Sequence, residues 1–118
     1  MMKLDLNLDI EWYYYILSSD ENDYTNFILV MSDNSVISAG CIRGIALKNN
    51  LDKDDCDITT IKYSKTGSLI WARATGGTGT DIITGIAASD NYEYIYHTGA
   101  TYSPNYIVSS GGDFYLAC

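Results

Sequence analysis

The residues best suited to chemistry in this sequence are few, and their spacing ties none of them together. His97 is the only histidine. General-base or nucleophilic catalysis would require a nucleophile and an orienting acid within hydrogen-bond reach of it, and the sequence assigns neither. We therefore predict no catalytic residue, and we interpret His97 as a strand histidine at a half-buried or rim position.

Two segments match known ligand loops only in part. Gly76-Gly77-Thr78-Gly79-Thr80-Asp81 is rich in glycine, but the Gly-Lys-Ser/Thr of a phosphate loop does not follow it. We expect a turn between strands there instead. Residues 52–57 gather the carboxylates that calcium requires, without the glycine and the downstream glutamate of the known calcium loop. A solvated acidic loop is the favoured interpretation and calcium the alternative, so the sequence predicts no cofactor and no metal.

Three cysteines, Cys41, Cys56 and Cys118, make an odd number without metal-ligand spacing. Reduced thiols are the default expectation. The exception is the pair Cys41 and Cys56, which would lie at the facing ends of adjacent strands and would bridge in an oxidising compartment. Cys118 stays unpaired in either case.

Charge and hydropathy exclude several classes of partner. The formal net charge is -8 with seven Lys and Arg, so the surface offers no basic stripe for nucleic acid or anionic membrane. The start of the sequence alternates apolar and polar types, which predicts no export signal. A full-length chain would then be cytoplasmic, and a fragment could come from an extracellular or surface protein. No apolar stretch approaches the roughly eighteen residues of a membrane span.

The chain repeats itself with a period of half its length. Lys3 and Trp12 recur as Lys62 and Trp71, and Gly40 recurs as Gly99 at the same offset. Asp57 recurs as Asp113 at a slightly shorter offset, which places small insertions in loops. We therefore expect one domain, 1–118, built of two repeats at about 1–61 and 62–118.

Within a repeat, β-branched and alternating residues are interrupted by turn signals at short intervals. This pattern is typical of antiparallel strands. The expected strands are 57–63 and 68–73 around a turn at 64–67, then 81–88 and 92–100, with 113–118 opening the next repeat. No window has a helical period, so four strands per repeat are predicted.

These residues resemble the SBBP-type β-propeller repeats. The resemblance covers nearly the whole chain and depends on Asp57, Ile61-Lys62-Tyr63, Gly67, Trp71, Gly76-Gly77, Asp81, Ile86-Ala87, Ile95-Tyr96, Thr98-Gly99 and Gly111-Gly112-Asp113. The first repeat departs from the pattern, with Asn7-Leu8 at the turn glycine and no double glycine after its tryptophan. The resemblance implies an all-β fold of two four-stranded, blade-like repeats within a larger or oligomeric β-propeller, with Trp12, Trp71, Gly40, Gly99, Asp57 and Asp113 as structural anchors. It names no ligand.

Eleven tyrosines are the one compositional excess. Core and interface packing is the favoured interpretation of the excess, and a ligand platform is the alternative, because tyrosine is rigid and has one polar tip. The tyrosines expected at an interface or a ligand site are Tyr13, Tyr15, Tyr92, Tyr94 and Tyr96. The leading hypothesis is a non-catalytic module for protein binding, scaffolding or self-assembly. The alternatives are a carbohydrate-binding or adhesion domain that uses exposed tyrosines, and an enzyme whose site forms only in an assembled ring.

Assembly is expected because the sequence begins and ends at one repeat position. Residues 113–118 correspond to the start of a first strand, and residues 2–5 to its continuation. Neighbouring chains could join these pieces head to tail, and three or four chains would supply the roughly six to eight blades of a common propeller. The expected partners are therefore copies of this chain or other blades, with a protein or glycan ligand.

Overall fold

The chain folds entirely into antiparallel strands wherever the structure describes it. The computed structural model describes residues 1–14, 23–42, 56–91, 93–103 and 113–117, with backbone alone for 42 and 113–117. No helix occurs among these residues, and the predicted all-β class is confirmed. The strands are β1 (Met2–Leu4), β2 (Ile10–Tyr13), β3 (Tyr24–Val30), β4 (Val36–Ile42), β5 (Asp57–Tyr63), β6 (Leu69–Thr75), β7 (Asp81–Ala88), β8 (Ile95–Thr101) and β9 (Asp113–Ala117).

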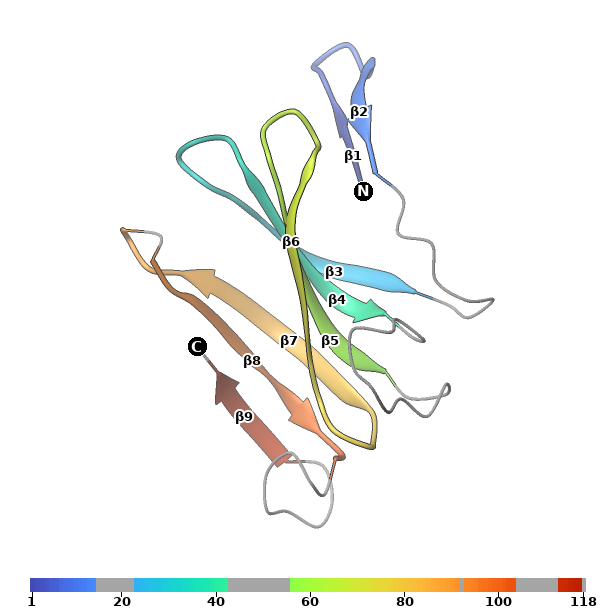
Figure 1. Ribbon diagram of the computed structural model, residues 1–118, viewed down its shortest axis with the longest axis vertical. Coiled ribbons are helices and arrows are strands. Elements are labelled where there is room, and N and C mark those ends of the chain that lie inside the picture. The colour runs from blue at the N-terminus through green and yellow to red at the C-terminus, as the bar shows by residue number, and fades with distance from the viewer. Residues whose placement is uncertain (15–22, 43–55, 92, 104–112, 118) are drawn as a thin grey trace.

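The strands form three separate sheets that follow chain order. The hairpin β1-β2 comes first, the four-stranded sheet β3-β4-β5-β6 second, and the three-stranded sheet β7-β8-β9 third. Figure 1 shows the four-stranded sheet between the other two. Each strand pairs with its neighbour in sequence, so every sheet is a simple meander.

Three of the hairpin turns share one backbone geometry. In each, the first residue donates its N–H to the carbonyl of the residue four positions on, and the fourth residue donates back to the first. The turns are 5–9, 31–35 and 64–68, with donor–acceptor distances of 2.8–3.1 Å. The fourth residue has a positive φ each time, at Leu8 (68°), Asn34 (62°) and Gly67 (83°). This conformation suits glycine and strains leucine, so Leu8 occupies a position that favours glycine.

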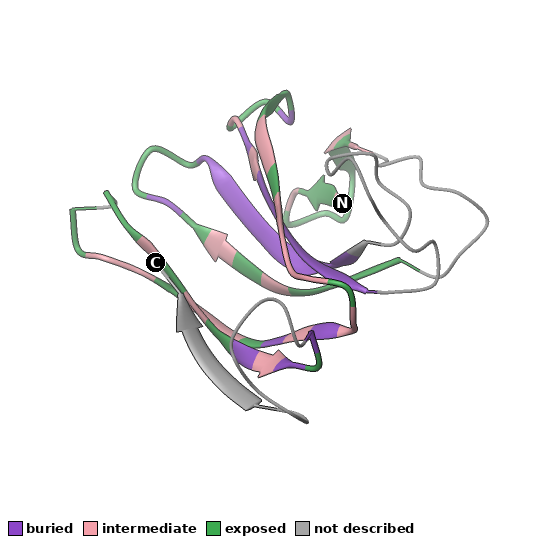
Figure 2. Cartoon of the chain, turned by 60° about the horizontal axis from the view of Figure 1, so that its bottom comes forward, coloured by how far each residue is buried: buried purple, intermediate pink, exposed green. Residues whose placement is uncertain are grey.

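The core lies on both faces of the four-stranded sheet, whose central strands are the most buried part of the molecule (Figure 2). Ile61 and Tyr63 are buried on the face toward the β1-β2 hairpin. Ile58 and Ala39 are buried on the opposite face, against Ile83 of β7. Successive side chains of a strand point to opposite faces, so β5 reads as a continuous buried run because both faces are covered.

The sheets divide the chain at different points from the predicted repeats. The hairpin 57–73 was expected in one blade with strands 81–88 and 92–100. Instead β5 and β6 complete the sheet that begins at Tyr24, and β7 opens the next sheet. The described residues therefore form one four-stranded sheet rather than two.

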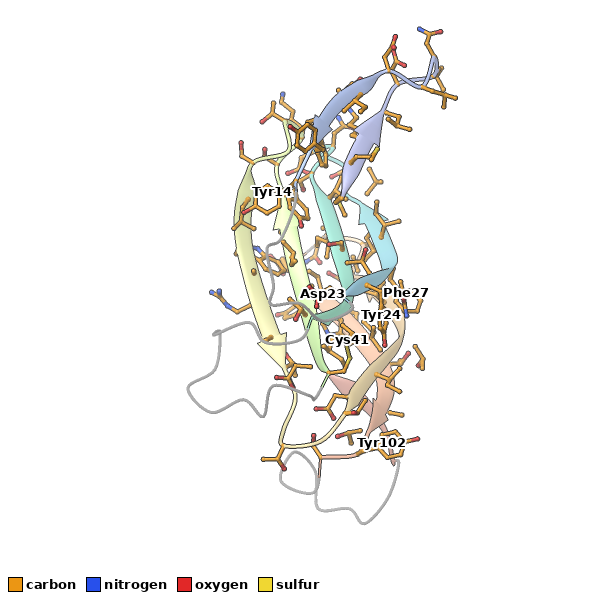
Figure 3. All side chains as sticks on the ribbon, turned by 90° about the vertical axis from the view of Figure 1, so that its right-hand side faces the viewer. Tyr14, Asp23, Tyr24, Phe27, Cys41 and Tyr102 are labelled. Atoms are coloured by element: carbon orange, nitrogen blue, oxygen red, sulfur yellow. A yellow bond between two sulfur atoms is a disulfide. The ribbon has the colours of Figure 1, made fainter. Side chains whose placement is uncertain are left out.

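A disulfide joins Cys41 of β4 to Cys56, immediately before β5, with the two Cα atoms 5.5 Å apart. The default expectation of reduced thiols is therefore wrong for this pair, and the bridged alternative holds. Both cysteines are buried, and the hydroxyl of Tyr24 lies 3.9 Å from the Cys56 sulfur. Tyr24 and Cys41 lie at the same end of the sheet (Figure 3). Cys118 lies outside the described residues.

The two repeated glycines occupy extended strands. Gly40 pairs with Thr25 of β3, and an added Cβ would overlap the backbone of Tyr24 and Thr25. Gly99 of β8 pairs with Ile83 of β7. Neither has a positive φ, since Gly67 is the one glycine among the described residues that does. Gly40 therefore lies where the backbones of β3 and β4 approach closely.

We predict that Gly40→Ala destabilises the protein by about 3 kcal/mol, because a rigid backbone would have to move. The matched control is Gly85→Ala, whose nearest obstacle is the rotatable Thr98 hydroxyl and whose cost should be about 1 kcal/mol or less. Urea unfolding measures both. Equal losses would contradict the close approach of β3 and β4.

Candidate functional site

The contact between the β1-β2 hairpin and the four-stranded sheet centres on Trp12. Its indole Nε1 donates to the carbonyl of Lys65, 3.1 Å away. The ring covers Gly67, whose added Cβ would lie 2.6 Å from Trp12 Cδ2. Tyr63 lies beneath, with ring centroids 6.2 Å from Trp12 and 5.3 Å from Tyr14. Trp12 therefore joins the β1-β2 hairpin to the four-stranded sheet.

Each tryptophan also stands beside a lysine and lines a groove. Lys3 pairs with Trp12 across β1-β2, and Lys62 pairs with Trp71 across β5-β6. The Trp12 groove lies between the hairpin and the β3-β4 turn, with a volume of about 170 Å³. The Trp71 groove lies between the four-stranded sheet and the β7-β8 turn, with a volume of about 340 Å³. The residues that open β4 and β8, one in each groove, are themselves one repeat period apart, at positions 36 and 95.

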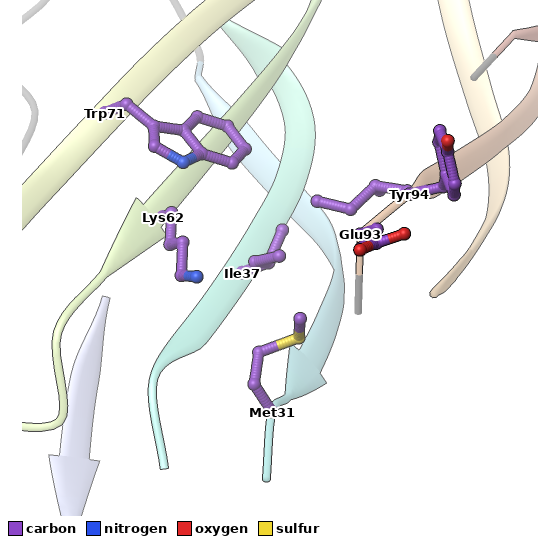
Figure 4. Close-up of a pocket in the computed structure, with 7 residues that line it drawn as sticks. Met31, Ile37, Lys62, Trp71, Glu93 and Tyr94 are labelled. Atoms are coloured by element: carbon purple, nitrogen blue, oxygen red, sulfur yellow. The ribbon is translucent and has the colours of Figure 1, made fainter. Parts of the chain in front are cut away.

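The Trp71 groove combines aromatic, apolar and charged side chains. Figure 4 shows Trp71, Lys62, Ile37 and Met31 on one side and Glu93 and Tyr94 on the other. Tyr94 is 55% exposed. An indole beside an ammonium and a carboxylate can stack on a flat ligand and hydrogen-bond to its polar edge.

His97 belongs to the opposite interface, between the four-stranded and three-stranded sheets. Its Nε2 lies 3.1 Å from the Thr60 hydroxyl of β5. Desolvation at this half-buried position lowers the pKa of His97 below its usual value. A neutral imidazole that links two strands is a packing group, in agreement with the predicted half-buried strand histidine.

The glycine-rich loop connects β6 to β7 and is hydrogen-bonded within the chain. Gly77 N–H donates to Asp81 Oδ2 over 2.8 Å, and Gly79 N–H donates to the Ser103 hydroxyl over 3.0 Å. Asp81 is buried and also accepts from Thr101, while its own N–H donates to the Cys56 carbonyl. Asp57 is buried beside this loop, its carboxylate against Gly76. The loop therefore ties consecutive sheets together, as a turn between strands should.

Three of the predicted tyrosines lie among the described residues, and they belong to two different parts of the fold. Tyr13 lies on β2 and is 60% exposed, Tyr94 lines the Trp71 groove, and Tyr96 lies on β8. Tyr15, Tyr92 and the acidic residues 52–55 lie outside the described residues. For Asp113 the structure gives the backbone alone, paired with Thr101. In the described part of the chain, no three His, Cys, Asp or Glu side chains group as metal ligands would.

Three features were not foreseen as parts of a site. Lys3 and Lys62 marked the repeat, but their pairing with tryptophan across a hairpin was not drawn from their nine-residue spacing. Tyr63 carries the aromatic contact with Trp12 and Tyr14, and the sequence marked it only as the last residue of an expected strand. The bonds of Asp81 to Thr101 and Ser103 join residues about twenty apart, for which the sequence has no signal.

Comparisons with protein-family models, with curated proteins and with solved structures found no match to this chain. Across the residues that the structure describes, no helix is long and apolar enough to cross a membrane. The geometry of the sheets and of the two grooves is therefore the basis for assigning a function.

We predict that Trp12→Ala destabilises the protein by about 2–3 kcal/mol, since it removes the indole that covers Gly67 and Tyr63. Trp71→Ala should cost about 1 kcal/mol, because its ring lines an open groove. Thermal unfolding of both variants checks the order. The repeat alone predicts equal losses of stability for the two variants. Equal losses would show that the two rings are buried to the same degree, and would contradict this prediction.

Proposed function

We propose that this chain is a non-catalytic β-repeat module, of the propeller-blade type, that acts in protein binding and self-assembly. The observation that carries the proposal is that successive sheets stack and that a groove lined by a tryptophan and a lysine recurs between them. A tryptophan beside a lysine, on the last hairpin of one sheet, faces the turns of the next. Stacks of this kind extend by adding sheets, because each new sheet buries a face that the preceding one leaves open.

The uncovered faces of the stack support a binding role. Four apolar or aromatic side chains of the β1-β2 hairpin are exposed, namely Met2, Leu4, Ile10 and Tyr13, at 53, 42, 59 and 60%. On β3, Ile28 and Val30 are exposed to a similar degree. Exposed apolar side chains gathered in this way mark an interaction site.

Light scattering across a concentration series tests self-assembly. We expect a mass that rises from 13.1 kDa to multiples of it as the chain goes from about 1 μM to about 1 mM. Each chain carries a net charge of -8, so copies repel one another. Raising the salt from about 0.05 M to about 0.5 M should therefore strengthen association. A monomer at every concentration and salt level would contradict self-assembly.

A second candidate function, carbohydrate binding, is favoured by the composition of the Trp71 groove. An aromatic ring offers a stacking surface for the C–H face of a sugar, and Lys62 and Glu93 supply a donor and an acceptor for hydroxyl groups. The groove is open and of a size suited to a small ligand.

A glycan array tests this candidate. If it is correct, Tyr94→Ala and Trp71→Ala should each weaken binding of any glycan that the parent retains, by about tenfold or more. Tyr13→Ala is the control, since Tyr13 is equally exposed but lies outside the groove. No retained glycan, or an equal loss in the control, would exclude the groove as a sugar site.

A further inference from the structure

The open face of the β1-β2 hairpin is the repeat equivalent of a face that is covered in this same molecule. Met2, Leu4 and Tyr13 lie one repeat period before Ile61, Tyr63 and Ala72. The latter three belong to the cluster that Met1, Trp12 and Tyr14 cover. The covered face shows which contact the open face lacks, namely a tryptophan from the last hairpin of a preceding sheet.

The chain also carries the complementary half of that contact. Trp71 occupies the repeat position of Trp12 and stands beside Lys62 as Trp12 stands beside Lys3. Trp12 contacts both Tyr63 and the β5-β6 turn of the next sheet. Trp71 lines an open groove with the β7-β8 turn.

We infer that the Trp71 groove of one copy receives the β1-β2 hairpin of a second copy, with Trp71 over Leu4 and the turn at residues 5–9. This inference rests on the proposed function and names its partner and surfaces. The two surfaces differ, so the contact is head to tail and leaves one of each kind free at the ends of any assembly.

The hairpin turn has the backbone geometry that the contact requires. The turn at 5–9 repeats the hydrogen bonds of the turn at 64–68. Leu8 N–H donates to Asp5 O over 3.1 Å, and Gly67 N–H donates to Ser64 O over 3.0 Å. By this equivalence, the indole N–H of Trp71 would donate to the carbonyl of Leu6, as Trp12 donates to that of Lys65.

The same position of the second copy's hairpin would also cover other exposed apolar side chains. β9 begins at the repeat position of β5, and β1 corresponds to the end of β5. The hairpin of the second copy would therefore extend the β7-β8-β9 sheet of the first into a four-stranded one. That composite sheet would lie over the second copy's four-stranded sheet and cover its exposed Ile28 and Val30.

One residue departs from the repeat. Leu8 is the repeat equivalent of Gly67, which lies under the Trp12 ring. The Leu8 side chain must therefore move before the Trp71 ring can pack over this turn. Leu8→Gly should therefore strengthen association by about tenfold, because it frees space and relieves a positive φ at once.

Two blocked variants test the contact. Leu4→Lys, at the repeat position of the buried Tyr63, places a charge on the hairpin face, and Trp71→Lys places one in the groove. Each variant alone should remain a monomer, since every copy lacks one of the two surfaces. Mixed together, they retain one intact groove and one intact hairpin, so they should form a 1:1 complex of about twice 13.1 kDa. Tyr102→Lys, at an exposed residue far from the hairpin (Figure 3), should associate like the parent.

The outcomes separate this inference from the proposed function. Association of either blocked variant alone, or a monomeric mixture when the parent associates, overturns the inference and leaves self-assembly standing. A parent that is itself monomeric overturns both. Circular dichroism of each variant, matched to the parent, shows that the loss of association comes from the surface and not from unfolding.

Discussion

The four-stranded sheet has apolar side chains on both faces, and the rest of the structure follows from the need to cover each of them. Ile61 and Tyr63 face one way and Ile58 and Ala39 the other. Burying the apolar side chains of both faces away from water is the main stabilising contribution available to a chain of this size. The β1-β2 hairpin covers one face and the β7-β8-β9 sheet the other. A sheet with two apolar faces is stable only when another sheet covers each face. The outermost sheets of the stack also have an apolar face, and that face needs a partner too.

Two kinds of contact hold the stack together at its opposite ends. At the turn end, Trp12 covers Gly67 and donates to a backbone carbonyl, which fixes how one sheet lies on the next. At the other end, the buried carboxylate of Asp81 accepts hydrogen bonds from Gly77 and Thr101, while its N–H reaches Cys56. A buried carboxylate is costly unless it is fully hydrogen-bonded, so this end of the stack is specific as well as closely packed. The disulfide at Cys56 adds a covalent link beside it.

Much of the fold could be predicted because strand signals are local. Alternation and turn residues located β5, β6 and β7 to within about two residues, and the repeat paired Trp12 with Trp71. The sheet boundary could not be found in this way. A repeat shows which positions are equivalent, but any starting point gives the same period. The boundary is set by the long-range bonds of the β6-β7 connection, such as Asp81 to Ser103. The groove at Trp71 was likewise not predicted, because its two sides come from different sheets.

The central claim is that Trp71 and the β1-β2 hairpin are two halves of one repeated contact. Isotope-filtered NOE spectroscopy tests it most directly, on an equimolar mixture of labelled and unlabelled chains at a concentration where the protein associates. The account predicts intermolecular NOEs between the Trp71 indole and the methyl groups of Leu4. Intermolecular NOEs that connect other surfaces, with none at Trp71, would contradict it.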